Sequence, residues 1–191
     1  LISELPEDRQ AEVIAQIEDE EHAQDIQELL TYDEDSAGGL MAKELVKVNE
    51  NWTVTKCVRE MRVQATEVKR VHSIYVVDDD DILLGRLSLK DLLTANNRAK
   101  IKSVYIQKVD FVNVNEEGDE VAKLMAKYDL EAVPVVDDKK KLLGRITIDD
   151  IVDFIKEEAD KDYQLAAGIA SDVEADDSIV DLTKARLPWL I

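Results

Sequence analysis

The sequence predicts an α/β fold built from one structural unit that occurs twice. Residues 71–93 (VHSIYVVDDDDILLGRLSLKDLL) align without a gap to residues 130–152 (LEAVPVVDDKKKLLGRITIDDIV), and nine of the aligned positions are identical. Six of the other fourteen exchange one aliphatic side chain for another, which together with the identities indicates duplication of a folded unit. Short β-rich runs alternate with segments of helical periodicity in both copies, and this alternation is typical of α/β proteins.

Each copy is expected to form strand, helix, strand, strand, helix (β-α-β-β-α). The first strand and helix come from VKVNENWTVTKCVREM (46–61) in one copy and VNVNEEGDEVAKLM (112–125) in the other. The runs IYVVD and VPVVD are β-rich, charged turns follow them, and LLGRLSL and LLGRITI supply the next strands. Apolar residues spaced i, i+3, i+4, i+7 predict buried helix faces. These faces are Val54, Cys57, Val58 and Met61; Val121, Leu124, Met125 and Tyr128; and Ile148, Ile151, Val152 and Ile155.

The last helix of each copy has a start signal. Ser88 and Thr147 stand where a strand ends, and Asp91 and Asp150 follow three residues later. This arrangement is typical of a helix N-cap.

The chain is strongly acidic. Its 191 residues include 43 acidic and 24 basic side chains, for a formal net charge of −19. Such a charge opposes binding to a phosphate backbone, so we expect no nucleic-acid partner. It suits cations, basic partners or simple solvation. Residues 148–162 (IDDIVDFIKEEADKD) are the clearest example, because this segment contains many carboxylates and few lysines.

The remaining composition narrows the class of protein. The single cysteine, Cys57, excludes an internal disulfide and a Cys-rich zinc site, and its apolar helix face predicts a core position. No apolar run is long enough to span a membrane, and the start is not that of a signal peptide. Because the chain begins at Leu1 and stops at RLPWLI, we expect a fragment. No nucleophile with a base and an orienting partner can be assembled, so we expect no enzyme.

Two motifs carry a family resemblance. The repeated VVD…LLGR(L/I)(S/T)(L/I)xD(L/I) resembles the cystathionine-β-synthase-type module, called CBS, which occurs as tandem pairs in regulatory domains. Upstream, YDEDSAGGLM (32–41), followed by the pair and then by ARLPWLI, resembles the cytosolic region of the MgtE family of magnesium channels.

The MgtE resemblance covers nearly the whole chain and implies four segments. Residues 1–41 would be an acidic helical segment, the remnant of an N domain. Residues 42–99 and 100–165 would be the first and second CBS domains. Residues 166–191 would be a connecting helix, the plug, which leads to a transmembrane domain absent from this sequence.

The function implied is that of a cytosolic regulatory domain of a magnesium channel or transporter. It would sense intracellular Mg²⁺ through acidic sites between domains and subunits, and gate the pore through the plug helix. Its partners would be a second copy, bound as a homodimer through the CBS pairs, and the pore domain of the same polypeptide. The implied location is the cytoplasmic face of the bacterial inner (cell) membrane, with this fragment itself soluble.

The resemblance also implies regulatory Mg²⁺ ligands. Magnesium prefers carboxylate and carbonyl oxygens and keeps much of its water. The implied positions are Gly39 and Ala126, through main-chain oxygens, and Glu117, Asp119, Asp129, Asp150, Asp153, Glu158 and Asp162. Two carboxylates about 6 Å apart repel by roughly 3 kcal/mol at an effective dielectric near 20, so a divalent ion between acidic surfaces would turn repulsion into attraction.

Several of these assignments have alternatives. A turn glycine with positive φ explains Gly39 equally well. Asp119 would also serve as the cap of a helix that starts at Glu120. Lys161 stands where the family has an acidic ligand, so either one ion is missing or the ammonium takes its place.

ATP is a second candidate ligand. CBS pairs that bind ATP or AMP commonly use an Asp near the ribose and a preceding Ser or Thr near phosphate, and these positions are Ser88, Asp91, Thr147 and Asp150. Helix capping alone explains the same pattern, and the chain has no Gly-rich phosphate loop. The alternative function is therefore a free-standing CBS-pair adenine-nucleotide sensor that regulates a metabolic enzyme.

Overall fold

The computed structural model describes residues 9, 13–17, 19–68 and 70–166. The chain forms two compact units, residues 1–151 and 152–191. Most of the expected plug, and the first residues of the acidic N-terminal segment, lie outside the described residues. Among the residues that are described, no helix combines the length and the apolar character that crossing a bilayer requires.

The predicted order of elements is confirmed in both copies. The first repeat (residues 46–94) contains β1 (Val46–Asn49), α4 (Val54–Glu67), β2 (Ile74–Val77), β3 (Leu83–Leu87) and α5 (Leu89–Thr94). The second repeat (residues 112–166) contains β4 (Val112–Asn113), α6 (Gly118–Tyr128), β5 (Ala132–Val136), β6 (Leu142–Thr147) and α7 (Ile148–Ala166). Among the described residues, α2 (Glu20–Leu29) and α3 (Ala37–Leu40) precede the repeats, and a 3₁₀ turn (Ile101–Ser103) lies between the two repeats.

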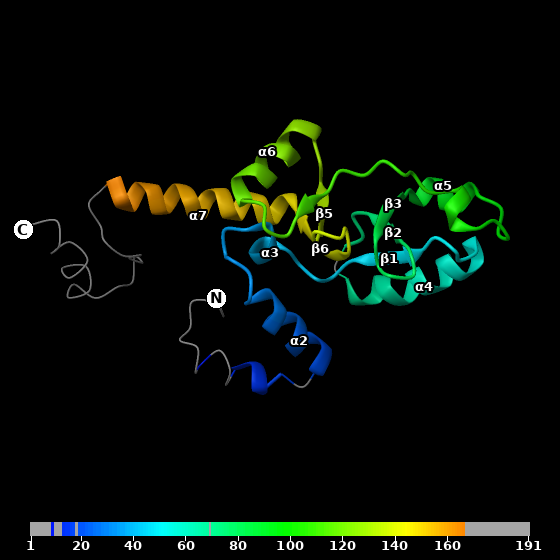
Figure 1. Ribbon diagram of the computed structural model, residues 1–191, viewed down its shortest axis with the longest axis horizontal. Coiled ribbons are helices and arrows are strands. Elements are labelled where there is room, and N and C mark those ends of the chain that lie inside the picture. Colours follow the sequence, from blue (N-terminus) through cyan, green and yellow to red (C-terminus); the bar gives the residue numbers. More distant parts are fainter. Residues whose placement is uncertain (1–8, 10–12, 18, 69, 167–191) are drawn as a thin grey trace, which may run out of the picture. The chain divides into compact units, whose positions relative to one another are not determined.

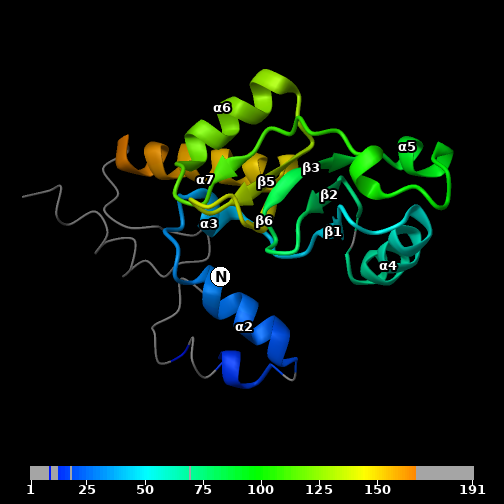
Figure 2. The same cartoon turned by 45° about the vertical axis from the view of Figure 1, so that its right-hand side comes forward.

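Each repeat has a three-stranded mixed sheet. β1 pairs parallel with β2, which pairs antiparallel with β3 (Figure 1), and β4, β5 and β6 repeat this topology (Figure 2). The register shifts between Val76 and Val77, and again at the equivalent Val135 and Val136. The duplication therefore extends to the irregularities of the backbone.

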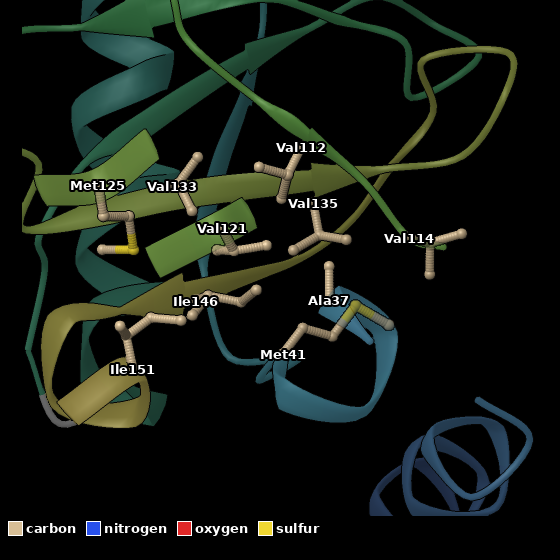
Figure 3. Close-up of a cluster of buried hydrophobic side chains, with 10 residues drawn as sticks. All are labelled: Ala37, Met41, Val112, Val114, Val121, Met125, Val133, Val135, Ile146 and Ile151. Atoms are coloured by element: carbon tan, nitrogen blue, oxygen red, sulfur yellow. The ribbon is translucent and has the colours of Figure 1, made fainter. Parts of the chain in front are cut away.

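The core of the second repeat is shown in Figure 3. Val121 and Met125 of α6 lie against strands β5 and β6, where Ile146 is fully buried. Ala37 and Met41, from α3 and its C-cap, belong to the same cluster. The AGGLM motif thus takes part in the packing of the second repeat.

The first repeat encloses its own core around Cys57, Val48, Val76 and Leu92. Cys57 is fully buried, as its helix face predicts. Burial raises the pKa of its thiol to about 11, so the side chain behaves as a small apolar group.

The two repeats meet through their hairpins. Tyr75, Val77 and Leu83 form a cluster with Val136 and Leu142. The turns of the two hairpins also bond to each other, because the Leu83 amide donates to the Lys140 carbonyl at 2.9 Å and the Leu142 amide donates to the Asp81 carbonyl at 2.9 Å. These reciprocal bonds make the contact nearly symmetric.

The glycine of each LLGR motif admits a crossing segment. Ala42 exchanges backbone hydrogen bonds of 2.8 and 2.9 Å with Arg145, and Ile106 does the same with Arg86 at 2.9 and 3.0 Å. A Cβ at Gly144 would lie 2.8 Å from the Ala42 carbonyl oxygen, and one at Gly85 would overlap the Ile106 carbonyl oxygen. Packing therefore excludes a side chain at both positions.

The predicted buried face of α7 is wrong. Ile151 is buried, but three members of the expected stripe are 38 to 49% exposed: Ile148, Val152 and Ile155. Phe154 is buried instead. Apolar spacing identifies an apolar face of a helix, but it does not say that the same chain covers that face.

The α6 prediction is wrong at one position. Val121 and Met125 are buried and Leu124 packs on the core, whereas Tyr128 is 49% exposed. Tyr128 is the last residue of α6, and Asp129 then adopts a left-handed conformation with φ 51°. The fourth member of the stripe therefore lies at the last position of the helix, where it is half exposed.

Candidate functional site

The candidate ligands Gly39 and Glu117 lie in neighbouring segments, although they are far apart in the sequence. Ser36 forms an antiparallel bridge with Glu117, and the Gly118 amide donates to the Asp35 carbonyl at 2.7 Å. The fold therefore brings the AGGLM segment beside the start of α6.

Gly39 is not a turn glycine with positive φ, so that alternative is wrong. The residue lies in α3, where its amide donates to the Ser36 hydroxyl at 3.3 Å. A Cβ at Gly39 would overlap the Asp33 carbonyl oxygen. Close packing accounts for the missing side chain whether or not the Gly39 carbonyl binds a metal.

Helix α6 begins earlier than expected. Its N-cap is Glu117 and its first residue is Gly118, so the alternative that Asp119 caps a helix starting at Glu120 is wrong. The Glu117 side chain makes no capping hydrogen bond. Both Glu117 and Asp119 are exposed at a helix N-terminus, where carboxylates are favoured.

Ala126 and Asp129 lie at the other end of α6. The amides of Asp129 and Leu130 both donate to the Met125 carbonyl, the latter at 3.0 Å. Because Leu130 is the residue that would continue the helical pattern to Ala126, the Ala126 carbonyl loses that donor. A main-chain oxygen and a carboxylate thus lie close in sequence at one exposed helix end.

Asp150 caps the start of α7. Its Oδ2 accepts hydrogen bonds from the Thr147 amide at 2.7 Å and the Thr147 hydroxyl at 2.6 Å. Thr147 is buried and Asp150 is half-buried. The capping interpretation of this pair is therefore confirmed, and one carboxylate oxygen of Asp150 is committed to it.

Further along α7, the candidate carboxylates point into solvent. Asp153 pairs with Lys156 and Glu158 pairs with Lys161, both at 2.9 Å, and Asp162 is exposed. Exposed pairs of this kind contribute little to stability. Lys161 therefore holds the carboxylate of a neighbouring candidate ligand.

Within the described residues, no three His, Cys, Asp or Glu side chains gather as a metal site. The candidates lie in three places: beside α3 at the start of α6, at the end of α6, and along α7. What this part of the chain offers is carboxylates singly or in pairs on exposed surface.

The nucleotide candidates differ between the repeats. Thr147 and Asp150 bond to each other, whereas Ser88, the N-cap of α5, makes no side-chain capping bond. Ser88 and Asp91 are both half-buried. The first repeat thus keeps a hydroxyl and a carboxylate available at the equivalent position.

Sequence reasoning missed a cleft of about 790 Å³ beneath α2. Asp25 and Glu28 of α2 line it together with charged residues of both signs from the rest of the chain: Lys43, Lys47 and Lys141, and Glu44 and Asp81. The sequence signal available for this cleft was an acidic helix followed by lysines. Nothing in the sequence places Lys141 beside them.

The comparisons with known proteins agree with the fold described above. Residues 37–98 and 101–157 match the family model described as CBS domain. The chain is similar to the magnesium transporter MgtE of Thermus thermophilus, with 39% identity over 87% of this chain. It spans only 38% of the length of that relative.

Two solved structures are similar over most of the chain. One is the soluble part of a magnesium transporter, with a TM-score of 0.76, 34% identity and coverage of 83% of this chain and 62% of that one. The other is the cytosolic domain of the Mg²⁺ channel MgtE in complex with ATP, with a TM-score of 0.65, 36% identity and coverage of 80% and 67%. These relatives are transporter regions and not enzymes, and the expected likeness to the MgtE cytosolic region is confirmed.

Proposed function

This chain belongs to the CBS domain family, and on that premise we propose that it is the cytosolic regulatory region of an MgtE-type magnesium channel. The match to a magnesium transporter across 87% of the chain carries the proposal. In this role the region senses intracellular Mg²⁺ at the cytoplasmic face of the cell membrane and gates the pore through the plug. It has no catalytic role.

Acidic surfaces provide the sensing mechanism. On α7, Asp153 and Glu158 are paired with Lys156 and Lys161 and Asp162 is exposed, so it is the net acidic charge of the helix that would repel a second acidic surface. Mg²⁺ between the two surfaces removes that repulsion. Because only differential affinity for two states shifts a population, several weak sites of this kind suit a sensor.

The other candidate ligands contribute in the same way. Asp150 offers the carboxylate oxygen that Thr147 does not use. The Ala126 carbonyl and Asp129 form a pair at the end of α6, and Gly39 offers a carbonyl beside Glu117 and Asp119. The remaining ligands come from water, from a second subunit or from residues outside the described part.

The proposed segments are those read from the sequence, with boundaries after residues 41, 99 and 165. Residues 1–41 are the end of the N domain and 166–191 the plug. The pore domain of the same polypeptide is the partner to which the plug transmits the state of the sensor.

The proposed homodimer has a candidate surface. Leu89 and Leu93 of α5 are 57 and 72% exposed, and the equivalent Ile148 and Val152 of α7 are 38 and 41% exposed. Both helices thus present an apolar pair at the same positions of the repeat. Apolar side chains repeated in this way favour an interface with a second copy.

Small-angle scattering with and without millimolar Mg²⁺ tests the sensor. The expected result is contraction with Mg²⁺ that the double variant Asp150→Asn, Asp153→Asn loses. Asn at position 150 keeps an acceptor for Thr147, so the fold is retained. The matched control is Asp149→Asn, Asp160→Asn, which removes the same charge from the same helix and should contract normally. Full contraction of the first variant would exclude those positions.

ATP binding is a second candidate function, favoured by the uncommitted Ser88 and Asp91. The similar MgtE cytosolic domain solved with ATP supports it. ATP titration of the wild type and of Asp91→Asn, followed by calorimetry, tests it, with loss of binding expected in the variant. ATP or AMP binding without any scattering response to Mg²⁺ would favour the free-standing adenine-nucleotide sensor instead.

A further inference from the structure

Each sheet of the CBS pair has two edges, and crossing segments cover one edge of each. Ile106 covers the β3 edge by exchanging backbone hydrogen bonds with Arg86, and Ala42 covers the β6 edge by exchanging them with Arg145. The opposite edges are the outer sides of β1 and β4, and no other strand among the described residues pairs with either of them. An uncovered edge presents N–H and C=O groups that can pair with another chain.

The outer edge of β1 is closed by a single side chain. The Lys47 amide donates to Gln64 Oε1 at 2.9 Å, and Gln64 Nε2 donates to the Lys47 carbonyl at 2.9 Å. Gln64 lies on α4 and is half-buried. Its amide thus makes the pair of bonds that one residue of an added antiparallel strand would make. Both bonds go to the main chain of Lys47, so they leave its side chain free to pair with Asp81.

The second repeat closes the equivalent edge in another way. Its edge strand β4 has two residues, where β1 has four. The Asn113 amide donates to Glu116 Oε2 at 3.3 Å, and the Asn113 carbonyl accepts from the Glu116 amide at 3.0 Å. Counted from the N-cap of each helix, Tyr128 of α6 occupies the position of Gln64. The repeat with the longer edge strand is therefore the one that carries the glutamine.

We propose that Gln64 blocks a self-complementary strand-pairing site on β1, which a second copy of this chain would otherwise occupy. Without the Gln64 amide, the main chain of Lys47 in each copy can donate to and accept from Lys47 of the other. A two-fold axis between antiparallel strands forms both bonds at once. The Lys47 ammonium is 2.8 Å from Asp81 Oδ1, which reduces the repulsion between the two lysines. Gln64 thus restricts self-association to other surfaces.

Hydrogen exchange and sedimentation of the whole chain test this role. Every protein compared carries Leu93→Glu, so that the proposed interface on α5 and α7 does not contribute to the association measured. Gln64→Met keeps the length of the side chain but removes the amide. In this variant we expect about tenfold faster exchange of the Lys47 amide at low protein concentration. At high concentration we expect self-association about tenfold tighter than that of the background.

Two further variants locate the effect. Ala65→Met places the same side chain at an exposed position of α4 and should change neither measurement. Adding Lys47→Pro to Gln64→Met removes the outward N–H of β1 and should abolish the new association, because proline is tolerated on an edge strand. Exchange in β5 reports whether any variant has unfolded.

Three results would overturn the role of Gln64. The first is association of Gln64→Met equal to that of the background, with unchanged exchange at Lys47. The second is equal association of Ala65→Met and Gln64→Met, which would assign the effect to an added apolar side chain. The third is association that persists with Lys47→Pro, which would place the contact on another surface. The scattering response to Mg²⁺ is a separate measurement, so this role and the sensor can fail independently.

Discussion

Lys47 Nζ lies 2.8 Å from Asp81 Oδ1, and the equivalent positions of the second repeat are also in contact but carry different side chains. Val48 pairs with Val76 as Val112 pairs with Val135, so Phe111 occupies the place of Lys47. Its partner is Lys140, whose Nζ lies 5.3 Å from the Phe111 ring centroid. An ion pair in one repeat thus corresponds to a cation–π contact in the other.

This equivalence makes the pairs exchangeable. Asp81→Lys alone places two ammonium groups together and should lower the free energy of unfolding by about 0.5–1 kcal/mol. Asp81→Lys with Lys47→Phe recreates the contact of the second repeat and should recover most of that loss. Lys is acceptable at position 81, because Lys140 has the same φ of 64° as Asp81.

Urea denaturation measures these differences. Asp80→Lys is the control, because it makes the same charge change at an exposed neighbour. If the double variant were less stable than Asp81→Lys, the two contacts would not be equivalent.

The LLGR glycines give a second prediction. Gly144→Ala should destabilise the chain by about 1–3 kcal/mol, because the new methyl meets the Ala42 carbonyl and forces the crossing segment away. Faster hydrogen exchange at the Ala42 and Arg145 amides would locate the damage. Unchanged protection at both amides would show that the segment adapts at no cost.

The tandem fold was predictable because a repeat doubles every local signal. The capping residues and the helix face around Cys57 each occur in an environment set by nearby sequence, whereas the LLGR glycines are required by segments that cross them from elsewhere in the chain. The role of Gly39 was not predictable in this sense, because its exclusion of a side chain comes from the Asp33 carbonyl in a turn that the sequence does not specify.

The sequence also could not predict which charged residues from distant segments come together. The sequence indicates an acidic α2, but the meeting of Lys43 with Glu28, and of both with Lys141, depends on how the two repeats pack. Exposure of Val152 was missed for a related reason. An apolar residue that stays exposed on a helix has the same sequence pattern as one that packs in the core of its own chain.

The buried thiol of Cys57 and the buried hydroxyl of Tyr75 predict a loss of stability at high pH. Burial raises the pKa of Cys57 from 9.0 to about 11 and that of Tyr75 from 10.0 to about 12. Both groups ionise more readily in the unfolded chain, so their contribution is complete below pH 9 and is lost as pH rises to 12. The slope reaches at most about 1.4 kcal/mol per pH unit for each group.

Urea midpoints measured between pH 8 and pH 12 test this slope. Cys57→Ala should flatten the decline between pH 9 and 11, and Tyr75→Phe should flatten it between pH 10 and 12. A decline of wild-type steepness in the double variant would assign the alkaline instability to other groups.

The position of Lys161 predicts stronger metal binding in a simple variant. Its ammonium lies 2.9 Å from Glu158 Oε1 and competes with any cation there. Lys161→Glu should raise the apparent Mg²⁺ affinity roughly threefold to tenfold, because a competing charge becomes a ligand charge. Scattering titrations measure the midpoint, and Lys102→Glu controls for net charge. Equal midpoints in the two variants would remove Glu158 from the proposed sensor.

The exposed apolar pairs on α5 and α7 predict the dimer surface. Leu93→Glu and Val152→Glu each place a charge in the proposed interface, and should weaken dimerisation by roughly a hundredfold, because an unpaired charge would be buried on association. Sedimentation across a concentration series measures the dissociation constant. The control is Val63→Glu, because Val63 is 58% exposed on α4, outside the two repeated pairs. If Val63→Glu weakened association while Leu93→Glu and Val152→Glu did not, the interface would lie on α4.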